Sequence, residues 1–160
     1  MLTHHLPALR RPGAQLLAIG AHADDIEIGA GGTVLQLLSV APATVDVRWV
    51  VLSATPARAE EARASAAAFC SDARSVTVDV HDLPDGRFPA EWGTLKETLQ
   101  ALAAETDPDL VLTTNRGCRV KDLGSEPQED LGLRSRGRAQ LESTRCEGGG
   151  AVPDLQRLRV

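Results

Sequence analysis

Short apolar runs alternate with longer, mixed stretches through the first 115 residues of the chain. Four runs rich in Val, Leu and Ile predict buried strands, at residues 15–21, 44–52, 75–80 and 109–114. Helices are expected between them, at residues 30–40, 56–70 and 92–105. Thr55 and Pro56 are typical of an N-cap and a first helical position. This alternation predicts an α/β layered fold with a mainly parallel sheet and right-handed crossovers, in which ligands bind beyond the carboxyl ends of the strands.

The pattern ends near residue 115. Residues 1–115 hold 15 acidic and 8 basic side chains, whereas residues 116–160 hold 7 acidic and 9 basic side chains, 7 of the 14 glycines and no aromatic residue. The second segment has no sustained period, so we predict an irregular tail with a short helix near Leu131–Leu141. The expected organisation is an N-terminal extension (1–14), an α/β domain (15–115) and an Arg/Gly-rich irregular tail (116–160).

Composition narrows the class of protein. The formal net charge of −5 argues against a dedicated nucleic-acid binder, and two Trp, two Phe and no Tyr offer no stacking platform for bases. No apolar run approaches the roughly 18 residues of a membrane span. Three cysteines without a CxxC pair argue against a disulfide framework, and residues 1–13 lack the apolar region of a signal peptide. We therefore expect a cytoplasmic protein.

Three ionisable residues follow the first predicted strand: His22, Asp24 and Asp25. Imidazole and carboxylate groups are common zinc ligands. In a loop, His22 and Asp25 can turn towards one ion while Asp24 faces another direction and acts as a general base. An Asp pair after a strand is also commonly a helix N-cap with a surface turn. The spacing alone leaves both interpretations open.

Residues 28–33, IGAGGT, are rich in glycine and precede a predicted helix. A phosphate cradle at the start of that helix is conceivable. The segment matches neither GxGxxG nor GxxxxGK[ST], and Asp24 and Asp25 beside it repel phosphate. A nucleotide-binding domain is therefore the weakest of the functional hypotheses for this chain. The alternative role for these glycines is to let the loop and the helix pack closely.

Residues 20–33, GAHADDIEIGAGGT, resemble the opening signature of the PIG-L/LmbE-like N-deacetylase family, which typically reads AHPDDxExxxGG. The similarity continues in RAEEARA (58–64), LPDGR (83–87) and PDLVLT (108–113), so that it covers about residues 15–115. The resemblance implies a Rossmann-like α/β fold. It also implies a bacterial-type enzyme that uses one Zn²⁺ ion to remove an acetyl group from a small N-acetylglucosamine-type sugar or a related amide.

The resemblance also implies roles for individual residues. His22 and Asp25 are similar to the first two zinc ligands, and Asp24 is similar to the general base that activates the metal-bound water. Asp85 would lie at the edge of the pocket, and Arg58 would contact the sugar or a substrate anion. A turn aspartate and a solvated helix arginine are the alternative interpretations of these last two residues.

This chain departs from the family pattern after the fourth predicted strand. Relatives continue with an HxDH-like segment that supplies the third zinc ligand and a second functional His, whereas residues 113–120 read TTNRGCRV. The histidines of the chain are His4, His5, His22 and His81, of which His81 is the candidate substitute ligand. A change of reading frame near residue 116 would explain both this departure and the change of composition, and resequencing the coding region would test it.

Two functional hypotheses follow. The first is a zinc-dependent N-deacetylase of which this chain forms the front portion, with little or no activity because the HxDH segment is missing. The second is a non-catalytic α/β fragment or binding module of the same fold. The sequence does not identify the substrate or the oligomeric state.

Overall fold

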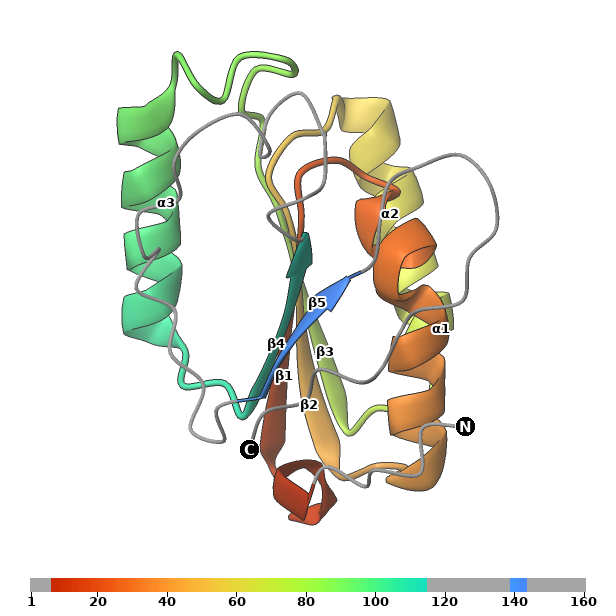
Figure 1. Cartoon of the computed structure of the whole chain (residues 1–160). Helices are drawn as coiled ribbons and strands as arrows, with labels where there is room; N and C mark the ends of the chain where they lie inside the picture. Colours follow the sequence, from red (N-terminus) through yellow and green to blue (C-terminus); the bar gives the residue numbers. More distant parts are fainter. Residues whose placement is uncertain (1–6, 115–138, 144–160) are drawn as a thin grey trace.

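A five-stranded parallel sheet forms the centre of the molecule in the computed structural model, which describes residues 7–114 and 139–143 (Figure 1). The strand order is β3-β2-β1-β4-β5. The strands are β1 (Ala14–Gly20), β2 (Val45–Val51), β3 (Ser75–Val80), β4 (Leu110–Thr114) and β5 (Ala139–Ser143). The helices are the 3₁₀ turn η1 (Pro7–Arg10), α1 (Asp25–Val40), α2 (Pro56–Phe69) and α3 (Trp92–Glu105). The predicted α/β fold with a parallel sheet is confirmed.

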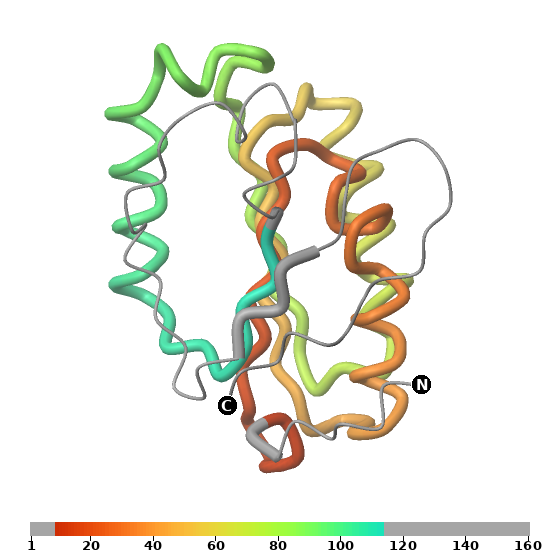
Figure 2. Tube along the Cα trace, in the orientation of Figure 1, coloured from red at the N-terminus to blue at the C-terminus, as the bar shows by residue number. Residues whose placement is uncertain are grey.

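The helices form a layer on each face of the sheet, with α1 and α2 on one side and α3 on the other (Figures 1 and 2). Because successive strand residues point to opposite faces, β1 contributes to two cores. Leu16 lies in the core under α1 and α2 with the fully buried Trp49, and Leu17 lies in the core under α3 with the fully buried Phe88. This packing fixes the positions of all the strand ends.

Helix α1 begins at Asp25, five residues earlier than predicted, so the glycine-rich segment lies inside the helix. Glycine is a poor helix former, but here a tertiary contact requires it. A Cβ atom on Gly31 would lie 2.6 Å from the ring of Phe69 on α2, so only glycine allows the two helices this close approach. The predicted close-packing role is confirmed for Gly31, whereas a Cβ atom on Gly32 would meet no atom within 4 Å. The phosphate-cradle interpretation is wrong because the N–H groups of this segment belong to the helix interior.

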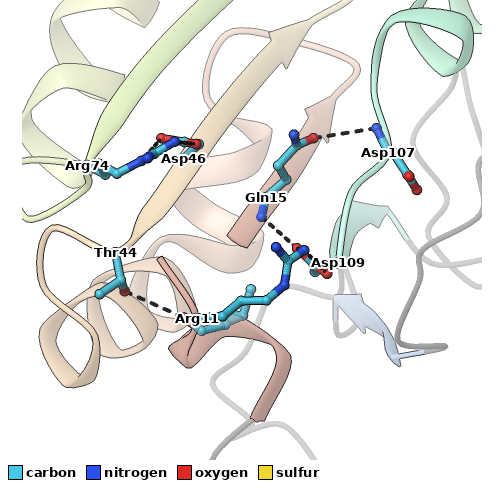
Figure 3. A network of polar contacts seen from close by, with 8 residues as sticks. Arg11, Gln15, Thr44, Asp46, Arg74, Asp107 and Asp109 are labelled. Carbon is cyan, nitrogen blue, oxygen red and sulfur yellow. Dashed lines mark hydrogen bonds and ion pairs between the residues drawn. The ribbon is translucent and has the colours of Figure 1, made fainter. Parts of the chain in front are cut away.

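Ion pairs tie the strands together at their amino ends (Figure 3). Both oxygens of Asp109 accept hydrogen bonds from Arg11, at 2.7 and 2.6 Å, and one also accepts the backbone N–H of Gln15 at 2.8 Å. The hydrogen bond and charge of Asp109 raise the pKa of the Arg11 guanidinium. Arg74 donates to both oxygens of Asp46, which holds the pKa of that carboxyl group below its ordinary value.

One element lies within the predicted irregular tail. Strand β5 pairs in parallel with β4, from Leu110 opposite Ala139 to Thr114 opposite Ser143. The prediction of a short helix near Leu131–Leu141 is therefore wrong for its last residues, because hydrogen bonding to the edge of β4 favours an extended backbone there. Residues 1–6, 115–138 and 144–160 lie outside the described part of the chain, together with the remaining predictions for the tail. Within the described part, no helix is long and apolar enough to cross a bilayer.

Candidate active site

The candidate site lies at the carboxyl edge of the sheet, the upper edge in Figure 1. The hydrogen bonding between β1 and β2 continues just beyond the two strands. The N–H of Leu52 donates to the carbonyl of Gly20, and the N–H of Ser53 donates to the carbonyl of Ala21. Ala21 and Ala23 are buried on either side of His22. The chain is therefore anchored around His22, whose side chain keeps about a quarter of its surface exposed.

His22 and Asp25 face each other in the turn between β1 and α1. One oxygen of Asp25, Oδ2, accepts the backbone N–H of His22 at 2.8 Å and lies 3.4 Å from Nδ1 of the same residue. Two ligand atoms on one tetrahedral zinc ion, each about 2.0–2.1 Å from the metal, are roughly 3.3 Å apart. The spacing of Nδ1 and Oδ2 therefore fits two neighbouring positions of a zinc coordination sphere.

Asp24 points in a different direction, towards α2. Its Oδ2 atom lies 3.1 Å from Nη2 of Arg58, and Nη1 of Arg58 donates to Glu61 at 2.8 Å. Asp24 occupies the N-cap position of α1, yet its side chain makes no capping hydrogen bond. The N-cap interpretation thus holds for the position of Asp24, while its carboxylate pairs with Arg58 instead of capping the helix. About half of the Asp24 side chain is exposed, so the group remains accessible to a small molecule.

A loop after β3 brings Asp85 and Phe88 to the His22 ring. Nε2 of His22 lies 3.1 Å from Oδ1 of Asp85. The ring of Phe88 stacks on the imidazole with centroids 6.3 Å apart and planes 14° from parallel. Phe88 itself is fully buried in the core under α3. The imidazole is thus contacted on three sides, by Asp25, Asp85 and Phe88.

Within residues 7–114 and 139–143, no three side chains of His, Cys, Asp or Glu lie where they would share one metal ion. Asp85 is no third ligand beside Asp25, because the two carboxylates approach opposite nitrogens of His22. His81 joins no such group either, although its backbone is fixed by hydrogen bonds to Val51 and Ala54. The described residues therefore fit two ligands of a zinc ion.

Two further ionisable residues, Glu27 and Cys70, have buried side-chain groups on α1 and at the end of α2. Both carboxylate oxygens of Glu27 on α1 are buried without a hydrogen-bond partner among the described residues. Burial raises the pKa of the Cys70 thiol at the end of α2 to about 11, and the charge of Glu27 adds to this effect. A thiol with a raised pKa is a poor nucleophile. Cys70 is therefore a packing residue and no candidate for covalent catalysis.

The structure brings all five residues singled out in the sequence to one edge of the sheet, in two groups. His22, Asp25 and Asp85 form the first group, and Asp24 and Arg58 form the second. Sequence reasoning missed Phe88 and Glu61. An apolar residue two positions after the Asp-Gly pair at residues 85–86 was the available signal for Phe88, whereas the spacing of Arg58 and Glu61 on one helix face was the signal for Glu61.

Comparison with known proteins agrees with this fold. The family model PIG-L, described as GlcNAc-PI de-N-acetylase, matches residues 17–123. Among solved structures, the chain is similar to N,N'-diacetylchitobiose deacetylase from Pyrococcus horikoshii in complex with its inhibitor MPG, with a TM-score of 0.54 and 20% identity. The match covers 77% of this chain and 51% of that one, so this chain spans about half the length of that structure. A comparison with curated proteins gives no match.

Proposed function

Because this chain belongs to the PIG-L family, we propose that its site is that of a zinc-dependent N-deacetylase acting on a small N-acetylated sugar. The observation that carries this proposal is the facing pair of His22 Nδ1 and Asp25 Oδ2, 3.4 Å apart at the carboxyl edge of the sheet. The names of the family and of the chitobiose deacetylase support an N-acetylglucosamine-type substrate. A location in the cytoplasm is part of the same proposal.

In this proposal, His22 and Asp25 hold the zinc ion and Asp24 serves as the general base. Zinc, when bound, supplies a Lewis acid that lowers the pKa of water and polarises a carbonyl group. Asp24 would take the proton of the water that attacks the acetamide carbon and return it to the amide nitrogen as the C–N bond breaks, so that acetate and the free amine leave. About half of the Asp24 side chain is exposed, and its carboxylate pairs with Arg58 at 3.1 Å; in this proposal it turns towards the water when substrate binds.

We expect the activity of this chain to be low. Catalytic zinc sites normally have three protein ligands, and the described part of the chain supplies two. The alternative function is a metal-binding or sugar-binding module without catalysis. The ion pair of Arg58 with Asp24 is the observation that favours this alternative, because Arg58 neutralises the proposed base in this conformation.

Calorimetric zinc titration of the full chain tests the proposal. We expect one zinc ion per chain and at least about a tenfold loss of affinity in Asp25→Ala, since a metal ligand is removed. The matched control is Asp72→Ala, which removes an exposed aspartate outside the site and leaves the affinity unchanged. Equal affinity of the wild type and Asp25→Ala would refute the metal site.

Acetate release separates the enzyme from the module. With zinc present, slow release of acetate from an N-acetylglucosaminide, abolished in Asp24→Asn, supports the deacetylase. Zinc binding that depends on His22, without any acetate released, supports the module instead. Turnover at a rate typical of enzymes, about 1–10³ s⁻¹, would contradict our expectation of low activity.

A further inference from the structure

We propose that Asp85 and Phe88 are positioning residues, which fix the His22 ring so that Nδ1, and not Nε2, is presented beside Asp25 for the metal. This inference rests on the zinc site of the proposed function. It assigns to Asp85 a role at the imidazole, and it gives a role to Phe88, which sequence reasoning missed.

The loop that carries both residues is built to hold a fixed shape. Leu83 and Phe88 are buried at its two ends, and Leu83 donates its N–H to the carbonyl of Leu52 on the β2 side. Between them, Arg87 donates to the carbonyl of Pro84, closing a turn in which Gly86 takes a φ of +72°. Glycine adopts that region without strain. Asp85, although 80% exposed, therefore projects from a turn with both ends anchored.

The contact with Asp85 decides which nitrogen of His22 carries the hydrogen. Both ring nitrogens face a carboxylate oxygen, which only accepts hydrogen bonds. The contact of Nε2 with Asp85 Oδ1 is the shorter one, 3.1 Å against 3.4 Å for Nδ1 and Asp25 Oδ2, and that Asp25 oxygen already accepts the backbone N–H of His22. We therefore assign the hydrogen of a neutral imidazole to Nε2. The lone pair then lies on Nδ1, the nitrogen that is 3.4 Å from Oδ2 of Asp25. A histidine that ligates a metal is usually oriented in this way, by a hydrogen bond from its other nitrogen to a carboxylate.

Phe88 fixes the plane of the same ring. Its own position is determined by the core under α3, where its side chain has no exposed surface. Because the two rings lie 14° from parallel, rotation of the imidazole out of this plane would break the stack and move Nδ1 away from Asp25. Asp85 thus selects the nitrogen, and Phe88 holds the ring orientation.

The first readout is independent of catalysis. Nitrogen-15 NMR of the metal-free full chain, recorded at a pH at which the shifts of both ring nitrogens show a neutral His22, reports the tautomer of that ring. We expect the form with hydrogen on Nε2 in the wild type and a mixture of tautomers in Asp85→Ala. Asp85→Asn should restore the wild-type form, because its side-chain carbonyl still accepts the hydrogen bond.

The second readout is zinc affinity. We expect a loss of about 10- to 100-fold in Asp85→Ala and a much smaller loss in Asp85→Asn. Asp82→Ala, the matched control, removes an exposed aspartate from the same segment and should change neither readout. Phe88→Leu keeps an apolar core residue while removing the stack, so we expect the same tautomer with an affinity reduced severalfold.

The outcomes separate the two proposals. A wild type that binds zinc, with tautomer and affinity unchanged in Asp85→Ala, overturns this inference and leaves the proposed function standing. Equal losses in Asp85→Asn and Asp85→Ala also overturn it, because they assign to Asp85 a role through charge. The wild type could also fail to bind zinc while Asp85→Ala still changes the tautomer of His22. That result would overturn the metal site and would support the positioning contact between Asp85 and His22.

Discussion

The two edges of the sheet both carry charged residues, but they use them differently. At the amino edge, each carboxylate meets a guanidinium group: Asp109 with Arg11, and Asp46 with Arg74. At the carboxyl edge, the three carboxylates of Asp24, Asp25 and Asp85 lie around one imidazole and one guanidinium group. These two ion pairs at the amino edge are each balanced in charge, whereas the named residues at the carboxyl edge have an excess of acceptors.

This difference separates structural from functional use of charge. Asp109 is 4% exposed and accepts three hydrogen bonds. These bonds connect the residue before β4 to Arg11, which follows η1, and to Gln15 of β1. At the carboxyl edge, the carboxylates of Asp24 and Asp85 are more than half exposed and have fewer partners among the described residues. Exposed carboxylates with few partners contribute little to the stability of the fold, which agrees with the functional role proposed for this edge.

Among substitutions at the carboxyl edge, we expect Asp24→Asn to have the largest effect, and this effect is on the rate of acetate release. Loss of a general base commonly costs about 10²–10⁴-fold in rate, so acetate release should fall at least about 100-fold. Zinc affinity should change little, because Asp24 points away from His22 towards Arg58. The control is Asp72→Asn. Unchanged acetate release in Asp24→Asn would show that the carboxyl edge does not use this residue as its base.

Asp109→Ala should have the largest effect at the amino edge. The substitution leaves the backbone N–H of Gln15 without its buried acceptor and removes charged hydrogen bonds, so the free energy of unfolding should fall by about 2–3 kcal/mol. Urea denaturation measures this loss, while zinc titration of the folded fraction should show unchanged affinity. A large loss of zinc affinity with intact stability would break the division of roles between the two edges.

The middle of α1 connects the packing of the fold to the site. Gly31→Ala would place a Cβ atom 2.6 Å from the Phe69 ring. Overpacking typically costs about 1–3 kcal/mol, and the better helix propensity of Ala returns about 1 kcal/mol, so we expect a net loss of about 1 kcal/mol. The matched control, Gly32→Ala, meets no atom within 4 Å and should stabilise the chain by about 0.5–1 kcal/mol. Equal effects in urea denaturation would contradict the packing role of Gly31.

The smallest effect concerns the acid stability given by Asp46. Its folded-state pKa lies below the ordinary value of 3.8, chiefly because Arg74 donates hydrogen bonds to it. The stabilisation is therefore complete above pH 3.8 and is lost as the pH falls through the lower, folded-state pKa. Half-exposure of Arg74 lets solvent screen the pair and keeps this effect small.

Urea midpoints of wild type and Asp46→Asn should differ by a constant amount at neutral pH and converge in acid. A difference that grows as the pH falls would contradict the lowered pKa. Asp72→Asn, again from outside the ion pairs, should follow the wild type at every pH.

The sequence predicted the strands well and the start of α1 poorly. The apolar runs at residues 15–21 and 44–52 are easy to recognise, because most residues of β1 and β2 are buried in a parallel sheet that is covered on both faces. At α1, the adjacent aspartates predicted a loop before residue 30, whereas the helix begins at Asp25. Inside the helix, Gly31 makes a close contact with Phe69 on another helix. Such a contact is absent from any local pattern.

The candidate site divides in the same way. His22, Asp24 and Asp25 lie within one short segment, so the sequence placed them together at the end of one strand. Arg58 and Asp85 are distant in the chain and entered through the family resemblance. The contacts of Asp24 with Arg58 and of His22 with Asp85 depend on the packing of α2 and of the loop after β3 against that strand end.

The sequence by itself therefore determined the alternation of strands and helices, the family, and the residue types at the end of β1, because all of these are written in local spacing. The tertiary structure decided the order of the strands, the early start of α1 and the contacts of His22 with Asp85 and Phe88. Each of these depends on which surfaces pack together, and that choice is made by burial over the whole sheet.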